Sequence, residues 1–263
     1  TSDKNRFNLG LGYISDEGII IREKLKKYLI SFSDEYKVNK SIKLGVNLNA
    51  SRQENPYDAG WVLDAARKVM PHVSATPTSF KVRDPYRTIY DSMTVPIYSG
   101  LVTALQNSGV VNPVLQVENE WDKTISRENR YVGSLYADIS FLKDFNFRAT
   151  WYADVSDVNR RKYNPLYYAY NPMNNTPYLY TGASVATATT SLEENNDNYR
   201  KYQQDYILTY KKKFGDHSLT ATGGFTTFYF GARNNYAKST AGGAITALQI
   251  PNDPNKWYVS NNF

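Results

Sequence analysis

Few side chains in this sequence of 263 residues have the chemistry of a catalytic site. There is no cysteine, which excludes thiol catalysis, disulfides and zinc–thiolate sites. Neither His72, which follows Pro71, nor His217, at a tight turn, has a serine or aspartate at the spacing of a nucleophile pair. Glu118 and Glu120, two apart on an extended chain, would share a face without flanking a sugar ring as glycosidase carboxylates do. With no metal-ligand spacing or phosphate-binding glycine loop, the sequence predicts no enzyme, no cofactor and no metal site.

Aromatic side chains are better candidates for binding, because a ring offers a large contact area to a sugar or an extended peptide at low entropic cost. The candidates for substrate contact lie in expected loops: Trp61, Trp121, Tyr167, Tyr168 and Tyr170. For each of them the alternative is packing between loops or against a partner protein. A second set of candidates would face an aqueous lumen or pair with another part of the protein: Asp138, Arg148, Tyr152 and Asp154.

Polar and basic clusters suggest ion binding. The segments 195–198 and 252–255 carry oxygen ligands of the kind that calcium prefers, but neither has the spacing of a calcium loop, so polar turns are favoured. The basic clusters at 22–27 and 160–162 suit lipopolysaccharide phosphates, because charge-assisted bonds to phosphate are strong. Despite the net charge of +6, no extended basic face with interleaved aromatic residues indicates a nucleic-acid partner.

Most of the chain reads as strands. Segments that alternate apolar and polar residues with a period of two, typical of half-buried strands, are 6–14, 28–37, 42–51, 131–141, 145–155, 202–210 and 219–229. Trp257–Ser260 would open a further strand. In the clearest pair, Leu135 and Ala149 lie on one face and Asp138 and Arg148 on the other. Strands of about 11 residues are long enough to cross a bilayer at a tilt.

The connections between these strands alternate between tight turns and long loops. Tight turns lie at 38–41, 141–145 and 213–217, while long connections run from 157 to 199 and from 231 towards 257. Residues 52–127 have no sustained strand period, although Asp58–Met70 has helical spacing that ends at Pro71. Structureless loops of such length are uncommon in compact soluble domains, whereas membrane barrels have short periplasmic turns and long external loops. We therefore predict an all-β fold, an antiparallel transmembrane β-barrel in which 52–127 is a long extracellular loop with a short helix.

Composition agrees with this reading. The mean hydropathy is −0.57, and no apolar run approaches the length of about 20 residues that a membrane helix needs. A barrel wall dilutes its apolar residues, because every second side chain faces water. The 23 tyrosines suit aromatic girdles at the membrane interfaces, although tyrosine is also a favoured strand residue. Since small barrels have lumens filled by side chains, an arc of a larger barrel fits loops of this size better.

Several segments, in this order, resemble the SusC/RagA-like TonB-dependent outer-membrane transporters. They are 7–13 (FNLGLGY), 16–20 (DEGII), 112–119 (NPVLQVEN), 131–154 and 214–225 (FGDHSLTATGGF). The resemblance implies a barrel of about 22 strands with an N-terminal plug, energised through TonB and covered outside by a SusD-like lipoprotein. Residues 1–263 are then expected to be a central part of the barrel domain, without the plug, the TonB box and the remaining strands.

These observations predict an importer of oligosaccharides or peptides in the outer membrane of a Gram-negative bacterium. The expected partners are a SusD-like lipoprotein, the TonB complex through other parts of the protein, outer-membrane lipid and lipopolysaccharide, and the substrate, with no nucleic acid. The alternative is a surface adhesin that binds glycans through its tyrosine-rich face and transports nothing. Substitution of Leu135 or Ala149 by arginine distinguishes the importer from the adhesin. Membrane assembly would be disrupted only if these positions face lipid.

Overall fold

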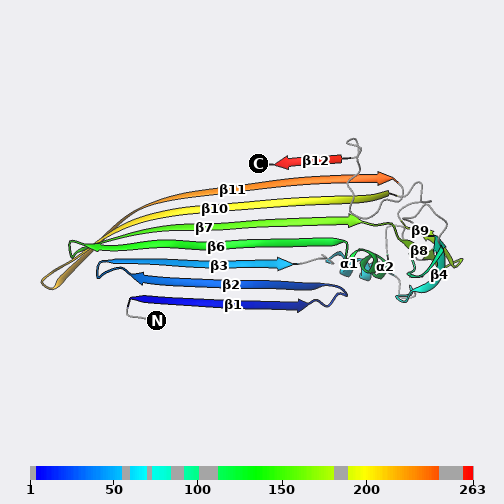
Figure 1. The fold of residues 1–263 in the computed structure, drawn as a ribbon, viewed down its shortest axis with the longest axis horizontal. Helices are drawn as coiled ribbons and strands as arrows, with labels where there is room; N and C mark the ends of the chain where they lie inside the picture. The colour runs from blue at the N-terminus through cyan, green and yellow to red at the C-terminus, as the bar shows by residue number, and fades with distance from the viewer. Residues whose placement is uncertain are drawn as a thin grey trace.

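A computed structural model describes residues 4–54, 60–69, 73–83, 92–100, 112–180, 189–242 and 257–262. They form a long eight-stranded antiparallel sheet with a cluster of loops, short hairpins and helices at one end (Figure 1). The strand order, β1-β2-β3-β6-β7-β10-β11-β12, follows the sequence, so each large strand pairs with its neighbours along the chain. The all-β prediction is confirmed, including the further strand at Trp257.

The strands of the large sheet extend beyond the predicted segments at the loop end. Their bounds are Asn5–Glu17 (β1), Lys24–Lys37 (β2), Ile42–Glu54 (β3), Thr124–Phe141 (β6), Phe145–Asn164 (β7), Thr189–Phe214 (β10), His217–Gly242 (β11) and Trp257–Asn262 (β12). At about 3.3 Å per residue, the 26 residues of β10 extend well beyond a hydrocarbon core of about 30 Å. Outside the bilayer both faces of a strand meet water, so apolar and polar residues no longer alternate there. The predicted connections over 157–199 and 231–257 were therefore longer than the observed ones.

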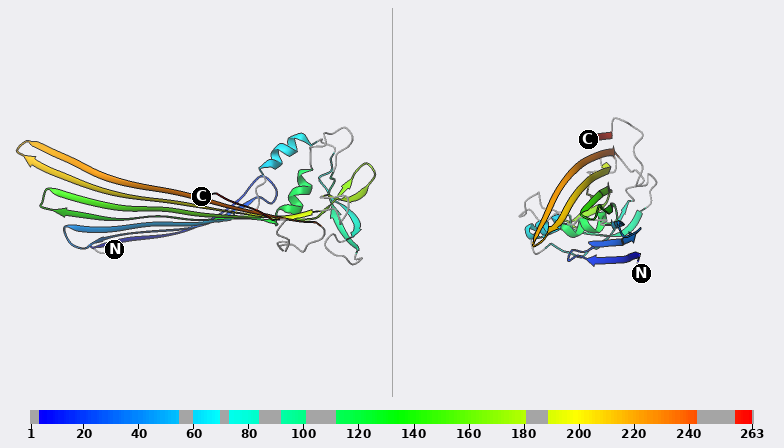
Figure 2. Two further views of the ribbon diagram at one scale, coloured as in Figure 1. Left: turned by 90° about the horizontal axis from the view of Figure 1, so that it is seen from above. Right: turned by 90° about the vertical axis from the view of Figure 1, so that its left-hand side faces the viewer.

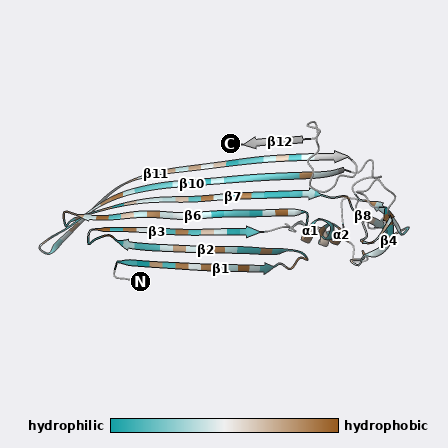
Figure 3. Cartoon of the chain, in the orientation of Figure 1, coloured by the Kyte–Doolittle hydropathy of each residue, from teal (hydrophilic) through white to brown (hydrophobic). Residues whose placement is uncertain are grey.

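The register keeps apolar residues on one face across the whole sheet. Directly paired residues point to the same side, and one such row runs from β1 to β11 through Leu9, Phe32, Leu48, Gly133, Ala153, Tyr202 and Tyr229. We call this side the apolar face and the opposite side the polar face. Large side chains on the apolar face are exposed, with Leu11 at 76% and Leu135 at 52%. Figure 3 shows the alternation along the strands and the mainly hydrophilic half of β10 nearer the loop cluster.

The two ends of the sheet differ. The tight turns at one end lie between β2 and β3, β6 and β7, and β10 and β11, as predicted (Figure 1). In the first of them Asn39 accepts hydrogen bonds from two backbone N–H groups, and in the last Gly215 takes the left-handed conformation at φ +59°. The sheet is curved and the loop cluster lies at the opposite end (Figure 2). Among the described residues, no helix is long and apolar enough to cross a membrane.

The loop cluster is more ordered than the sequence suggested. It contains α1 (Trp61–Lys68), the hairpin β4–β5 (Thr78–Arg83, Ser92–Ile97), α2 (Pro113–Glu120) and the hairpin β8–β9 (Tyr168–Asn171, Thr176–Leu179). The helix α1 lies within the predicted helical segment, and the loop expected over 52–127 lies between Glu54 and Thr124. Glu118 and Glu120 are in α2 rather than on an extended chain, so they point in different directions and the shared-face interpretation was wrong. His72, Pro71 and 252–255 lie outside the described residues.

Candidate functional site

Helix α2 is central to the loop cluster, and the residue before it fixes where it starts. Asn112 Oδ1 accepts a hydrogen bond from the Val114 N–H at 3.1 Å, and Pro113 occupies the first turn, where it gives up no helical hydrogen bond. The side-chain amide of Asn112 donates to the carbonyl oxygen of Ser99 at 2.7 Å. The start of α2 is thereby tied to the chain that follows β5.

One side of α2 is buried against the segment that follows β7. Glu120 is 7% exposed and accepts hydrogen bonds from the Tyr167 hydroxyl at 3.2 Å and from the Gln116 amide at 3.3 Å. The ring of Tyr167 stacks on that of Tyr180 with 5.1 Å between centroids. Leu115 is fully buried and packs in the same cluster as Tyr167. This polar and apolar contact joins the two long loops of the molecule.

A second contact between the same loops lies under the β4–β5 hairpin. Tyr170 is 7% exposed and packs with Val82 and Ile97, and its ring centroid is 5.3 Å from that of Phe80. The Gly100 N–H donates to the Tyr170 carbonyl at 3.0 Å, which extends the contact to the backbone. The β8 strand is therefore held by side chains and main chain together.

The other side of α2 faces the short turn between β1 and β2. Arg22 donates two hydrogen bonds to the Glu118 carboxylate, from Nη2 at 3.0 Å and from Nε at 3.3 Å. Its guanidinium carbon lies 5.0 Å from the centroid of the Trp121 ring, a cation–π distance. Arg22 has φ +68°, the left-handed region, so local strain accompanies these contacts. Val117, fully buried, packs against Trp61 and Trp121 at this junction.

Two cavities flank α2. The first, of about 590 Å³, is lined by the β1–β2 turn, Trp121 and the ends of β2, β3 and β6. The second, of about 410 Å³, lies between β5 and α2 and is lined by Tyr167, Tyr168 and Glu118, with the apolar side chains of Met93, Val95, Ile97 and Leu166. Because Glu118 lines the second cavity and Arg22 the first, their ion pair lies between the two. The second cavity offers an apolar surface beside hydroxyl groups and one carboxylate.

Burial changes the ionisation of tyrosines in the cluster. It raises the pKa of Tyr178 to about 12 and also raises the pKa of Tyr180, where the charge of Glu120 adds to the effect. The pKa of Tyr98 is raised by burial and then by the charge of Glu118. These hydroxyls therefore remain neutral hydrogen-bond donors at physiological pH.

The lumen-facing candidates nearest the tight turns make contacts on the polar face. Asp138 accepts a hydrogen bond from the Asn146 amide at 2.5 Å. Arg148 is directly opposite Asp138 in the register, and its guanidinium carbon lies 4.6 Å from the centroid of the Tyr136 ring. The Tyr136 hydroxyl donates to Glu35 at 2.9 Å. Tyr136 and Glu35, which the sequence analysis did not select, thus connect β2, β6 and β7.

The other two lumen-facing candidates lie nearer the loops. Arg130 donates two hydrogen bonds to Asp154, at 2.8 and 3.0 Å, and Asp154 is 7% exposed. Tyr152 is half-buried, directly opposite Ser134 on β6 and Gln203 on β10. Arg148 and Asp154 are six residues apart on β7, about 20 Å along a strand. The four candidates share one face but do not form a single site.

The aromatic candidates are brought together more closely. All five lie in the loop cluster: Trp61 and Trp121 at the junction with the β1–β2 turn, and Tyr167, Tyr168 and Tyr170 beside or beneath the second cavity. The ion pair of Arg22 with Glu118 and the burial of Glu120 were not predicted from the sequence. The sequence Asn112-Pro113, a capping residue followed by proline, is the signal that would have placed α2 and separated its two glutamates.

No family model matches the chain. A curated relative, TonB-dependent receptor P3 of Formosa agariphila, is 22% identical over 228 residues, which cover 86% of this chain and 20% of that protein. Two solved structures share the fold over 99% of this chain and 27% of theirs. The RagAB peptide transporter matches with a TM-score of 0.65 at 14% identity, and the RagAB peptide importer in its closed-closed state with 0.63 at 13%. The chain thus spans about a fifth of the curated relative and about a quarter of the matched structures.

Proposed function

Because this chain is a barrel segment of a SusC/RagA-like TonB-dependent transporter of the Gram-negative outer membrane, we propose that the whole protein imports peptide or oligosaccharide nutrients. A SusD-like surface lipoprotein would cover the loop end and capture the substrate. The TonB complex would supply energy through parts of the protein beyond this segment. Residues 1–263 would all belong to the barrel domain, with the long loop between β3 and β6 on the extracellular side.

The observation that carries this proposal is the continuous apolar face of the large sheet. Exposed apolar side chains in register from β1 to β11 are costly in water and are favourable against lipid. The opposite face is mainly polar, although Phe228 and Phe230 lie on it, and a mainly polar face suits a water-filled lumen or a surface against a plug. Tight turns at one end and ordered loops at the other give the sheet the asymmetry of an outer-membrane transporter.

We place the substrate at the loop cluster, where the second cavity opens. Its lining combines the apolar side chains of β5 with Tyr168, Glu118 and the Asn119 amide. An apolar peptide side chain fits this lining better than a hydroxyl-rich sugar, and RagAB, which shares the fold, is described as a peptide importer. Tyr168 would then contact substrate and Tyr167 and Tyr170 would hold the cavity walls, whereas Trp61 and Trp121 pack on the other side of α2, at the junction with the β1–β2 turn.

The polar face would guide the substrate or meet the plug. Asp138, Arg148, Tyr152 and Asp154 alternate in charge and hydrogen-bonding character along β6 and β7. Contacts with Asn146, Tyr136 and Arg130 hold Asp138, Arg148 and Asp154, respectively, in position along the wall.

Uptake by the full-length protein in its native host tests the proposal. Deletion of the gene should abolish energy-dependent uptake of labelled oligopeptides, and Tyr168→Ala should raise the concentration for half-maximal uptake by about threefold or more. Met173→Ala, at an exposed turn between β8 and β9, is the matched control and should leave uptake unchanged. Uptake of oligosaccharides in place of peptides would reassign the substrate. Glycan binding without any uptake would establish the adhesin instead.

A further inference from the structure

A row of charged residues crosses the apolar face where its apolar belt ends towards the loops. Tyr13 and Tyr28, with ring centroids 5.2 Å apart, are the last aromatic pair of the belt on β1 and β2. Directly beyond them, Lys26 pairs with Glu54, and Glu54 pairs with Arg127, so all three side chains lie on the apolar face. The side chains on β1, β2, β3 and β6 thus change from mainly apolar to mainly charged within one step of the register.

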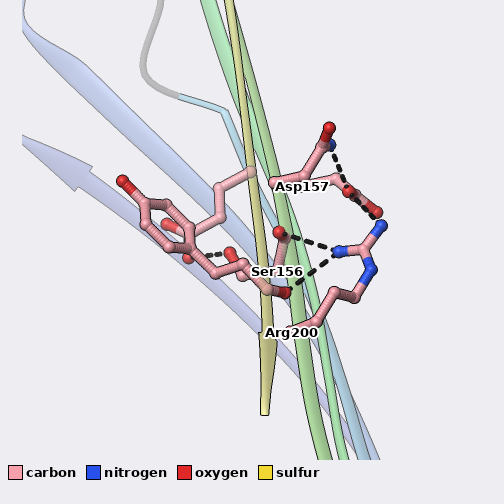
Figure 4. A network of polar contacts seen from close by, with 6 residues as sticks. Ser156, Asp157 and Arg200 are labelled. Atoms are coloured by element: carbon pink, nitrogen blue, oxygen red, sulfur yellow. Dashed lines mark hydrogen bonds and ion pairs between the residues drawn. The ribbon is translucent and has the colours of Figure 1, made fainter. Parts of the chain in front are cut away.

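The same transition occurs on the later strands. Arg200 on β10 lies opposite Val155, and its Nη2 atom donates to Asp157 Oδ1 at 2.8 Å (Figure 4). Arg200 Nη1 also donates to the Ser156 carbonyl at 3.2 Å. Arg233 on β11 is opposite Asn198, one step further from the belt. Positive charges at this level of the apolar face therefore occur from β2 to β11.

We call this set the basic band and define it by its six cations: Lys24, Lys26, Arg52, Arg127, Arg200 and Arg233. These cations occupy four successive rows of the register, and the carboxylates in the same rows are Glu17, Glu54, Asp157 and Glu194, so the band carries excess positive charge. Glu54 is shared by two arginines, at 2.9 Å from Arg52 and 3.7 Å from Arg127. Among the described residues Lys26 has no ion-pair partner. Lys26 can therefore bind a further anionic group without the loss of an existing ion pair.

The first cavity adds shape to this charge. It is lined by Lys24, Lys26 and Arg127 together with the turn residues Ile19 and Ile21, which are 92% and 49% exposed. A cavity that combines cations with exposed isoleucines, next to the apolar belt, matches a molecule with an anionic head and an apolar body. Glu23 also lines the cavity, and Glu17 there is paired with Lys24 at 2.6 Å.

We propose that the basic band and this cavity bind the phosphorylated headgroup of an outer-leaflet glycolipid. The band lies directly above the lipid-facing belt, at the depth where headgroup phosphates meet the protein. Arginine and lysine bind phosphate through charge-assisted hydrogen bonds, and Arg52 and Arg127 present forked donors. A free phosphate ion would use the same cations but has no apolar part for Ile19 and Ile21, so the lipid is the occupant that fits both features.

The experiment uses the full-length protein in nanodiscs with defined lipids and measures lipid retention by native mass spectrometry. The discs contain phosphatidylethanolamine with either phosphorylated lipid A or its enzymatically dephosphorylated form. The test variant is Lys26→Gln/Arg52→Gln/Arg127→Gln. The control variant, Lys37→Gln/Lys40→Gln/Lys43→Gln, removes three charges at the tight-turn end instead. Heat-modifiable migration in gels reports whether each variant still forms a folded barrel.

Wild type and control should retain phosphorylated lipid A. The band variant should retain about one tenth of that amount or less. Restoring charge with Lys26→Arg/Arg52→Lys/Arg127→Lys should restore retention. Equal retention by the band variant, equal retention of dephosphorylated lipid, or full displacement by millimolar inorganic phosphate would each overturn the proposal. If the band variant does not fold, Lys26→Gln alone, at a position with no ion pair to break, should still weaken retention, and unchanged retention would overturn the proposal.

Discussion

The barrel wall exposes its large apolar side chains, whereas the loop cluster buries side chains of the same kinds. In the wall, large apolar residues such as Leu11, Leu135 and Phe225 are 52–76% exposed, and most of the half-buried and buried side chains of the other face are polar. In the cluster, Leu115, Val117 and Ile97 are at most 2% exposed, as in a water-soluble protein. The burial of apolar side chains therefore follows the solvent around each region, which is lipid at the apolar face of the wall and water around the loop cluster.

The difference also concerns what holds each region together. The wall depends on backbone ladders between neighbouring strands, while the cluster depends on a few contacts between loops far apart in sequence. A change in one region should therefore leave the other largely intact.

The largest expected effect is in the cluster. Leu115→Ala removes a fully buried side chain beneath Tyr167 and should destabilise the folded cluster by about 2–5 kcal/mol. Hydrogen exchange should show faster exchange in α2 and β8, while the central strands stay protected and the barrel remains heat-modifiable. Loss of the barrel along with the cluster would mean that the two regions fold as one unit. Leu63→Ala, at a half-exposed position of α1, is the matched control.

The corresponding change in the wall is Leu135→Arg on the apolar face. A charged side chain near the middle of the bilayer should cost about 2–4 kcal/mol and reduce assembly into the outer membrane. Ala149→Arg should behave in the same way, with added steric cost because Ala149 is only 4% exposed. Ser134→Arg, one residue away but on the polar face, is the control and should assemble normally. Equal assembly of Leu135→Arg and Ser134→Arg would show that the apolar face does not contact lipid.

The wall and the loop cluster also differ in how much of their structure could be predicted from the sequence. The period of two at Leu135, Asp138 and Ala149 predicted the strand faces correctly because lipid and water lie on opposite sides of the wall. That information is lost where β7 and β10 leave the membrane, so the strand ends were misplaced. In the cluster, the partners Glu120 and Tyr167 are 47 residues apart, and nothing local in the sequence indicates that they meet.

A smaller effect is expected within the polar face, at Gly45. A Cβ atom there would lie 2.2 Å from the Tyr136 ring, so Gly45→Ala forces the ring away and should cost about 1–3 kcal/mol. The displaced ring would also lose its contacts with Arg148 and Glu35. Urea unfolding of the refolded full-length barrel measures the change.

A double-mutant cycle checks the cause. Tyr136→Ala should be much less destabilising in the Gly45→Ala background than in wild type, because there it also removes the ring that clashes with the added Cβ. Additive effects of the two substitutions would show that the ring does not cover Gly45. Gly223→Ala, where an added Cβ meets nothing within 4 Å, is the matched control on the apolar face.

The smallest effect is a loss of stability of the loop cluster at alkaline pH. It is absent at neutral pH and is expected in the cluster before the wall. The pKa of Tyr178 is raised from 10.0 to about 12, so the folded cluster favours the neutral phenol while the unfolded chain ionises earlier. Stability from this group is complete below pH 10 and is lost as the pH rises towards 12. Between these values, exchange or proteolysis in β8 and β9 should increase before the wall strands respond. Tyr178→Phe has no proton to lose and should move the onset to higher pH, while an unchanged onset would assign the loosening to Tyr98 or Tyr180, whose pKa values are also raised.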